Sequence, residues 1–429
     1  MMTNEQIIEL LHREVIPAIG CTEPIAVALC VARAKEKLGT EPETIRVTLS
    51  KNVYKNAFAV GIPNTGLTGL PIAIALGATI GNSSYQLEVL RKATTQAVEY
   101  AKEYLLRVPA NVMIDYNAPS ILYIHAEVSA QGKTATATIM DEHTHFVEET
   151  TDHTQKEESA STTDSSADPL CLLRVYEFAT SVDASQLGFL LDGAKMNISA
   201  AETSFADQYG HGLGRLLRST TLSGMPDMKR LFGDTLFTKI ISYTCGACDA
   251  RMSGAMVPVM SNSGSGNQGI SCSVPVYLYA KENNHTKEAT MRALALSNLT
   301  VVYIKQSLGR LSALCGCVVA ATGSAAGITY LMGGNYQEIT FAIKNMIANI
   351  SGMICDGAKP GCALKVTSGV STAIFSAYLA MQHSVADSTE GIVEEDIDRT
   401  IHNLTRIGHD GMQVTDDLIL EIMTNKKTH

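Results

Sequence analysis

Two cysteines at the ends of a short turn are the residues of this chain whose spacing most suggests chemistry. Seven positions separate Cys355 from Cys362, and the turn between them contains Gly357, Pro360 and Gly361. Glycine accepts positive φ and proline presets the bend, so such a turn lets both sulfurs point at one centre. The pair is either two ligands of a metal or iron–sulfur centre or two buried thiols in a loop between helices.

The other cysteines extend this pattern. The chain contains ten, and seven of them fall between positions 245 and 362. Three local pairs stand out, namely Cys245 with Cys248, Cys315 with Cys317, and Cys355 with Cys362. None has ferredoxin spacing, and no histidine follows at zinc-finger spacing. Each pair alone fits packing as well as ligation, because free cysteines are often buried hydrophobes. Together the pairs favour a cluster site without showing which sulfurs bind.

Cys21 differs from these pairs because it lies in the connector 18–24, just before the N-terminus of a predicted helix that runs to about Leu38 and whose first turn suits Pro24. The helix dipole and unpaired N–H groups stabilise a thiolate at such a position. Cys21 is therefore a candidate nucleophile, base or ligand. The alternative is a small residue that merely starts a helix.

A polar loop at 261–269, Ser-Asn-Ser-Gly-Ser-Gly-Asn-Gln-Gly, precedes another predicted helix. Backbone N–H groups at such a helix start can bind a carboxylate or phosphate. The loop is not a P-loop, because no Gly-Lys-Ser/Thr sequence follows it. We interpret it as an anion site, with a flexible loop as the alternative. The loop at 61–66 is a weaker candidate of the same kind.

Single charged residues carry less information. Lys365 follows Cys362 at a helix start, where it could hold a substrate carboxylate or be a solvated lysine. Four histidines could each carry protons but more often serve as hydrogen-bonded structural residues, namely His143, His145, His211 and His409.

Length and composition limit the protein classes. A chain of 429 residues predicts two domains. Its net charge of −10 argues against nucleic acid as a partner. The N-terminal residues do not have the pattern of a secretory signal, and the ten cysteines then indicate a reducing cytoplasm. An uncharged stretch over 311–337 could span a bilayer by length, but its glycines, serines and threonines favour a buried helix of a soluble core.

The pattern of elements predicts an α+β chain. Residues 1–147 mix helices, one of them expected over 85–105, with strands such as 44–50, and form a smaller α/β domain. Residues 148–168 are rich in Ser, Thr and acid, so they cannot bury enough surface to order and form a linker or loop. Residues 169–429 show helical periodicity throughout and predict a larger all-helical domain that holds the cysteine pairs.

Five dispersed motifs together resemble the L-cysteine desulfidase family, which is related to the iron–sulfur-dependent L-serine dehydratases. The resemblance covers nearly the whole chain. The motifs, in chain order, are 20–24 (GCTEP), 55–56 (KN) with 61–66 (GIPNTG), 266–269 (GNQG), 354–359 (ICDGAK) and 361–365 (GCALK).

The resemblance implies a 4Fe–4S cluster held by Cys315, Cys355 and Cys362, with one iron left open, and no nicotinamide or pyridoxal phosphate. Cys317 is an alternative to Cys315. The resemblance also implies that Cys21 is the catalytic cysteine and that a smaller α/β domain closes over the helical, cluster-bearing one.

On this basis the expected reaction is an α,β-elimination from L-cysteine to pyruvate, ammonia and sulfide. Cys21 as a thiolate is the expected base for the Cα proton. Further expected substrate contacts are the carboxylate-binding residues Ser263, Gly264, Asn267 and Gln268, together with Asn56 and Lys365. The expected partners are the amino-acid substrate and a second copy of the chain, with neither nucleic acid nor membrane.

Three other functions remain open from the sequence. L-serine is the rival substrate for the same cluster. A zinc or redox protein would use Cys245 and Cys248. A non-catalytic protein would bind amino acids in the glycine-rich cleft without converting them.

Overall fold

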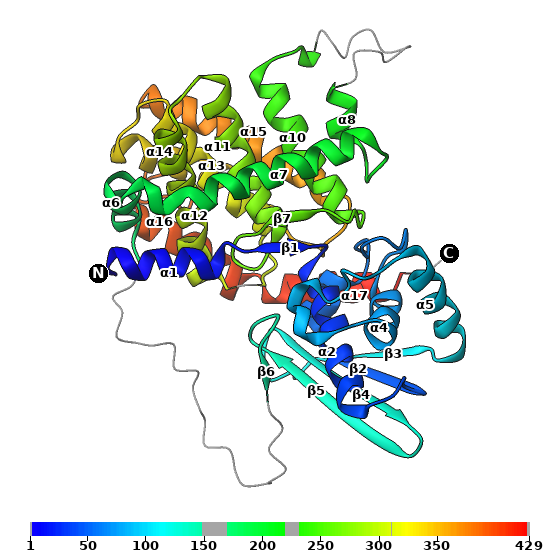
Figure 1. Ribbon diagram of the computed structural model, residues 1–429. Coiled ribbons are helices and arrows are strands. Elements are labelled where there is room, and N and C mark those ends of the chain that lie inside the picture. Colours follow the sequence, from blue (N-terminus) through cyan, green and yellow to red (C-terminus); the bar gives the residue numbers. More distant parts are fainter. Residues whose placement is uncertain (1, 148–169, 219–230, 310, 427–429) are drawn as a thin grey trace.

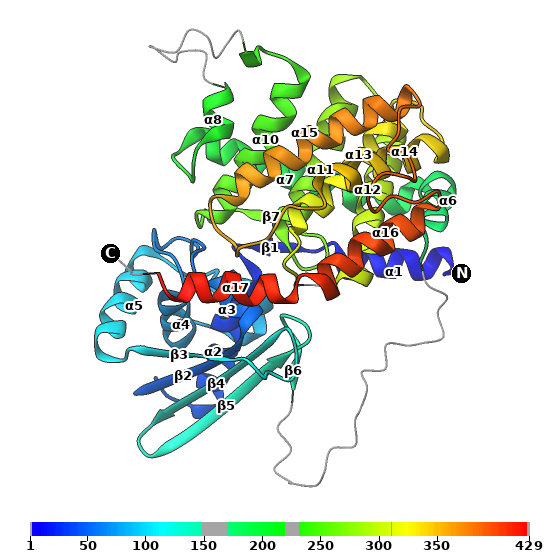
Figure 2. The same ribbon diagram turned by 180° about the vertical axis from the view of Figure 1, so that it is seen from behind.

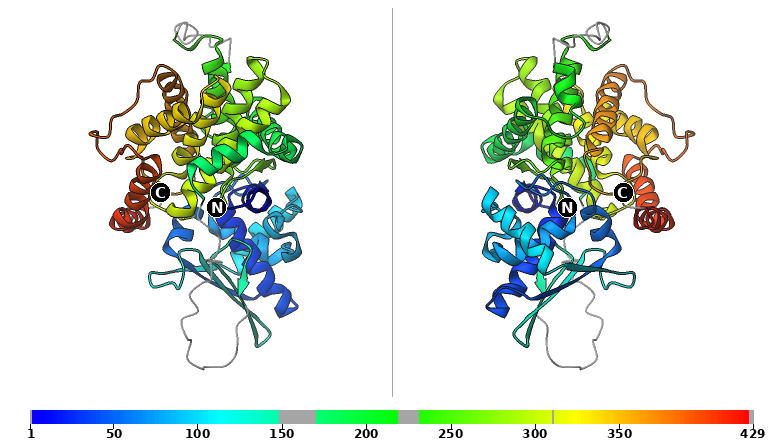
Figure 3. Two further views of the ribbon diagram at one scale, coloured as in Figure 1. Left: turned by 90° about the vertical axis from the view of Figure 1, so that its left-hand side faces the viewer. Right: turned by 90° about the vertical axis from the view of Figure 1, so that its right-hand side faces the viewer.

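The computed structural model describes residues 2–147, 170–218, 231–309 and 311–426. It consists of a small unit built on a sheet and a larger helical unit stacked on it (Figure 1). In side view the two units meet along one broad junction (Figure 3). The expected α+β class is confirmed. The acidic segment 148–168, predicted as a linker, lies outside the described residues.

The small unit is a five-stranded sheet with helices on one face. Its strand order is β3-β2-β4-β5-β6, with β2 and β3 parallel and the other pairs antiparallel. Alternate residues of β4 are buried, as the expected period of two requires. The bounds are β2 Thr44–Ser50, β3 Ala110–Asp115, β4 Tyr123–Ala130, β5 Lys133–Met140, β6 Phe146–Val147, α2 Thr22–Leu38, α3 Lys51–Ala57, α4 Leu70–Thr79, the 3-10 helix η1 Ser83–Glu88 and α5 Thr95–Arg107.

The single helix expected over 85–105 is wrong in its first half. The chain forms the short η1, leaves helical geometry, and restarts as α5. The side chain of Thr94 accepts a hydrogen bond from the Ala97 N–H and caps this new start. A threonine inside an apparently periodic stretch was therefore a boundary signal.

The helical unit packs around α13, which contacts α11, α12, α14 and α15. Nearly every residue of α13 is buried, in agreement with the buried helix expected within 311–337. A short strand, β7, also belongs to this unit. The bounds are α6 Leu172–Ser181, η2 Ala184–Leu187, α7 Gly188–Ala206, α8 Leu213–Arg218, α10 Leu236–Met252, β7 Pro258–Met260, α11 Gly266–Glu282, α12 Lys287–Leu308, α13 Gly316–Leu331, α14 Tyr336–Ile350, α15 Cys362–Met381, α16 Ile397–Arg406 and η3 Ile407–Gly411.

By length and composition, one helix of the described residues could cross a membrane. This helix is α15, and half of its apolar stretch is buried inside the protein. Core helices of soluble proteins pass the same test, so this match is weak evidence for a span.

The first and last helices each cross to the other unit. Helix α1 (Asn4–Glu14) buries Ile7, Leu10 and Leu11 in the core of the helical unit. Strand β1 (Pro17–Ile19) pairs with β7 and leads the chain into the small unit. Helix α17 (Gln413–Thr424) runs back along the small unit beside α3 (Figure 2). The division at 148–168 thus follows chain order, whereas the two units exchange their terminal helices in space.

A buried ion pair fixes α17 to the small unit. Lys55 of α3 pairs with Asp416 of α17, and their side chains are only 2% and 9% exposed. Asn52 donates a hydrogen bond to the same carboxylate. A neighbouring pair, Lys51 with Asp417, is much more exposed. Two such pairs on adjacent residues provide a matched comparison.

We expect Asp416→Ala to lower the free energy of unfolding by about 3–5 kcal/mol, because it leaves the Lys55 ammonium buried without a counter-charge. Asp417→Ala, the control, should cost no more than about 1 kcal/mol, since its pair is solvated. Urea unfolding followed by circular dichroism measures both. Equal losses for the two variants would contradict the assignment.

Candidate active site

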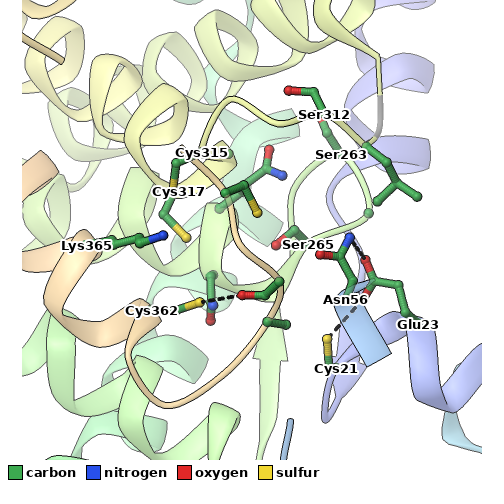
Figure 4. A pocket seen from close by; sticks show the side chains of 18 of the residues that line it. Cys21, Glu23, Asn56, Ser263, Ser265, Ser312, Cys315, Cys317, Cys362 and Lys365 are labelled. Atoms are coloured by element: carbon green, nitrogen blue, oxygen red, sulfur yellow. Dashed lines mark hydrogen bonds between the residues drawn. The ribbon is translucent and has the colours of Figure 1, made fainter. Parts of the chain in front are cut away.

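A cleft of about 730 Å³, open mouth included, lies between the two units. The helical unit supplies four cysteines, namely Cys315, Cys317, Cys355 and Cys362. The small unit supplies Cys21, Glu23 and Asn56 from the opposite side (Figure 4). Every residue predicted from the sequence lines it, namely Cys21, Asn56, Ser263, Gly264, Asn267, Gln268, Cys315, Cys355, Cys362 and Lys365.

Two adjacent backbone segments bring the cysteines of the helical unit together. Leu314 and Ile354 form a β-bridge, so Cys315 and Cys355 lie on neighbouring strands of chain. The Cys355 N–H donates to the Ala313 carbonyl at 2.6 Å. Cys315 is the N-cap of α13, and Cys362 is the first residue of α15. Three cysteines from distant sequence positions therefore face one cleft.

The turn between Cys355 and Cys362 touches the small unit directly. Gly357 has φ +89°, and a Cβ on it would collide with the carbonyl oxygen of Lys55. Only glycine combines this backbone conformation with this approach. The turn between Cys355 and Cys362 thus packs against α3, the helix that contains Lys55 and Asn56.

The thiols of this group differ in their acidity. A hydrogen bond with Cys317 lowers the pKa of Cys315 to about 6, and the pKa of Cys317 rises correspondingly. Burial raises the pKa of Cys355, and it raises that of Cys362 to about 12. Without a metal, Cys315 is therefore the thiolate of the group.

The donor set suits an iron–sulfur cluster better than a single ion. Among the described residues, no three His, Cys, Asp or Glu side chains are close enough together to hold one metal ion. The ligands of a cubane stand further apart than those of a single ion, because the cluster itself lies between them. Several mostly buried thiols around one cleft are the donors that iron–sulfur clusters take.

Across the cleft, Cys21 and Glu23 form a hydrogen-bonded pair at the start of α2. The Cys21 thiol donates to Glu23 Oε2 at 3.0 Å (Figure 4). The Asn56 amide donates to Oε1 of the same carboxylate at 3.3 Å. Thr22 also donates to Oε2, at 3.0 Å. All four side chains are buried.

Cys21 is a thiol in this arrangement, not the thiolate expected from its place before a helix. Burial raises its pKa well above the usual value, and the Glu23 charge raises it further. Arg251 acts in the opposite direction but does not compensate. Desolvation and a neighbouring carboxylate thus outweigh the helix dipole.

Glu23 was not selected from the sequence, although it belongs to the same GCTEP motif. Burial would raise the pKa of its carboxyl, but His143, the Cys21 hydrogen bond and Arg251 together lower it. Glu23 is therefore an ionised, buried acceptor that already holds the Cys21 proton in a hydrogen bond.

The loop at 261–269 leads into α11, whose N-cap is Ser265. Ser263 and Gly264 both have positive φ, which folds the loop tightly. Ser263 already uses its donors, since its N–H bonds to Glu14 and its hydroxyl bonds to Asn262. Asn267 and Gln268 line the cleft and belong to the first turn of α11, where amide groups lack an intrahelical partner. They are the stronger anion donors of this loop.

The two remaining predicted substrate contacts, Lys365 and Asn56, bond to other residues of this chain. Lys365 forms an ion pair with Asp356 and donates to the Ile354 carbonyl at 2.8 Å, so it braces the cysteine turn. Asn56 orients the Glu23 carboxylate.

Several residues that drew attention in the sequence lie elsewhere. Cys245 and Cys248 are fully buried in α10 and do not line the cleft. The N–H of His211 bonds to Asp249, and His409 pairs with Asp410 at the surface. Of the histidines considered, His143 is the one that lines the cleft. No sequence signal distinguishes His143 from the other histidines, because the β5–β6 loop that carries it has no motif.

The fold and this cleft define a class of protein, an α+β enzyme with a thiol-lined site between two units. Residues 84–421 match the family described as "Serine dehydratase alpha chain". The chain belongs to this family, and it is a lyase of the serine dehydratase type. The expected kinship with iron–sulfur-dependent serine dehydratases is confirmed.

Relatives from several bacteria match this chain over nearly its whole length. The chain is 55% identical over 428 residues to a "UPF0597 protein" of Phocaeicola vulgatus, covering 99% of this chain and 98% of the relative. It is 48% identical over 435 residues to one of Porphyromonas gingivalis, covering 99% of each. It is 42% identical over 425 residues to one of Oleidesulfovibrio alaskensis, covering 98% of each. These names state no substrate.

Glu23→Gln should make Cys21 more reactive toward iodoacetamide at pH 8. The change removes a negative charge that raises the Cys21 pKa, so the pKa falls and the thiolate fraction grows. The alkylation rate should rise about tenfold for each pKa unit lost. Mass spectrometry of the Cys21 peptide in metal-free, anaerobic protein gives the rate.

Glu9→Gln, on the exposed side of α1, is the control for this measurement and should leave the rate unchanged. An unchanged or slower rate in Glu23→Gln would show that Glu23 does not set the acidity of Cys21.

Proposed function

We propose that this protein catalyses an iron–sulfur-dependent α,β-elimination from a small L-amino acid, with L-cysteine as substrate and pyruvate, ammonia and sulfide as products. The observation that carries the proposal is the cleft in which Cys315, Cys355 and Cys362 face Cys21 and Glu23. The motifs resemble those of the L-cysteine desulfidases, and the family establishes the lyase class.

Cys315, Cys355 and Cys362 would hold a 4Fe–4S cluster in the helical unit. Bound in this way, the cluster supplies one iron without a protein ligand, a Lewis acid for the leaving group on Cβ. Lysines near the turn support this placement, because their charges favour thiolates at Cys315 and Cys355. No nicotinamide or pyridoxal phosphate enters the proposal.

The cysteine–glutamate pair supplies the base. The proton of Cys21 passes to Glu23 along the hydrogen bond that already joins them, and substrate binding must drive this transfer, because the resting pKa values of the two groups oppose it. The resulting thiolate takes the Cα proton of the substrate, and the leaving group departs from Cβ. Asn56 keeps the carboxylate of Glu23 in place throughout. The aminoacrylate product then tautomerises and hydrolyses to pyruvate and ammonia.

Burial makes the thiolate of Cys21 a stronger base. A cysteine thiolate formed in a desolvated site is a stronger base than one in water, because burial raises its pKa. Such a base forms only when a nearby acceptor takes its proton. The ionised Glu23 is such an acceptor, and it lies on the substrate side of the cleft.

L-serine is the second candidate substrate, and the family description favours it. The same cleft would serve both reactions, because only the leaving atom on Cβ differs. Comparison of kcat/KM for the two amino acids decides between them.

The remaining alternatives have less support. A zinc or redox role for Cys245 and Cys248 lacks further ligands among the described residues. A purely binding role gives no reason for a buried cysteine–glutamate pair. We further propose that the protein acts in the cytoplasm, where thiols stay reduced, and that it forms a homodimer.

Anaerobic reconstitution with iron and sulfide tests the function. We expect visible cluster absorption and pyruvate release from L-cysteine. Cys355→Ala should abolish both, whereas Cys21→Ala should keep the absorption and lose turnover. A Cys355→Ala protein that retained the cluster would contradict the ligand assignment. Pyruvate release by Cys21→Ala at the wild-type rate would remove Cys21 from the reaction.

Cys315 and Cys317 can be separated in the same assay. Cys315→Ala should lose the cluster, because it removes the one thiol whose pKa lies near 6. Cys317→Ala, a matched control two residues away, should bind iron and sulfide as the wild type does. The reverse result would make Cys317 the ligand.

A further inference from the structure

Arg251, near the end of α10, is a buried cation in the cleft without an acidic partner. Its side chain is the largest of those that are fully buried, and the residue is 2% exposed. Arginine is very seldom buried in this way unless it is paired. Among the described residues, no carboxylate lies within ion-pair distance of it.

Most of its hydrogen-bonding capacity is unused. Nη1 donates to Asn267 Oδ1 at 3.0 Å. Nε is buried without an acceptor and lies against Gly266. The described residues offer no acceptor to Nη2 either. A guanidinium has five N–H donors, so Arg251 can bind a further oxygen-bearing ligand.

Neither Glu23 nor Asp249 is bonded to Arg251. The oxygens of Glu23 accept hydrogen bonds from Cys21, Thr22 and Asn56. Asp249 accepts the N–H of His211 on Oδ1, and its Oδ2 is buried without a hydrogen-bond partner among the described residues. Neither acid therefore forms an ion pair with Arg251.

The charge around the cleft favours an anion. Among the described residues that line it, Arg251, Lys305 and Lys365 are cationic and Glu23 alone is acidic. Asp356 neutralises Lys365 from outside the lining.

The position of Arg251 points to the substrate rather than to a cluster. Lys55, Lys359 and Lys365 act electrostatically on the proposed cluster ligands. Arg251 instead acts on Cys21, Glu23 and the buried Cys248. Its partner Asn267 lies in the first turn of α11, where amide groups also favour an anion.

We propose that Arg251 binds the α-carboxylate of the amino-acid substrate, held in place by Asn267 and by the absence of a side chain at Gly266. This inference rests on the proposed function for the identity of the ligand. It makes Arg251 a substrate-binding residue that the sequence did not reveal. The carboxylate would be fixed beside Cys21, which brings the Cα proton toward the base.

Isothermal titration with L-alanine tests the proposal without turnover, since alanine carries the carboxylate and amine but no leaving group. Anaerobically reconstituted wild-type protein should bind L-alanine more tightly than L-alaninamide, which lacks the carboxylate charge. Arg251→Met should weaken L-alanine binding about 10- to 100-fold, as the loss of a charged hydrogen-bonding partner implies. It should leave L-alaninamide binding unchanged, so that the preference for the acid disappears.

Two further variants guard against misfolding. Arg251→Lys keeps the charge without the planar donors and should give an intermediate loss. Gly266→Ala keeps the arginine but displaces it, since the added Cβ would meet Nε. Arg399→Met, an exposed arginine on α16, is the control and should bind as the wild type does.

The outcomes separate the two proposals. Unchanged acid preference in Arg251→Met, or in Arg251→Lys and Gly266→Ala if the first variant does not fold, would overturn the role of Arg251. Failure of wild-type protein to prefer L-alanine over its amide would overturn it too. Acid-selective binding without pyruvate release from L-cysteine or L-serine would instead overturn the proposed function and leave the Arg251 site standing.

Discussion

The buried contact between α3 and α17 is the constraint on which the cleft depends. Lys55 pairs with Asp416, and the carbonyl of the same lysine seats Gly357 of the cysteine turn. The next residue, Asn56, holds the Glu23 carboxylate. One short helix thus joins the C-terminal helix, the turn between Cys355 and Cys362, and the proposed base. The two sides of the cleft keep their spacing because this helix contacts both.

Burial then decides the chemistry of each group. A cysteine thiol in water is a stronger acid than the Cys21 thiol is in the cleft. In water, a carboxylate would also not stay hydrogen-bonded to it. Inside the cleft, the Cys21 pKa rises and that of Glu23 falls, so the proton rests on sulfur while its acceptor stays charged. The opposite shift at Cys315 depends on one donated hydrogen bond. Local contacts, more than residue type, assign the roles of these cysteines.

Much of the fold and most of the cleft could be predicted from the sequence. Helix starts, glycine turns and alternating strands are local signals, and they located Cys21 and Cys362 at helix N-termini, whereas Cys315, expected inside a helix, proves to be the N-cap of α13. What escaped prediction depends on contacts over long separations. Lys55 and Asp416 are 361 positions apart, and nothing near either residue announces the other. The acidity of Cys21 likewise depended on Glu23, whose ionised state comes from groups on other elements.

The exchange of terminal helices also has a consequence for biosynthesis. The small unit contains residues made early, yet the partner that neutralises its buried lysine follows 361 positions later in the chain. Domains that fold as they emerge usually complete themselves before the chain ends. Here Lys55 has no counter-charge until α17 has been made, so a product truncated before α17 would leave this buried lysine unpaired.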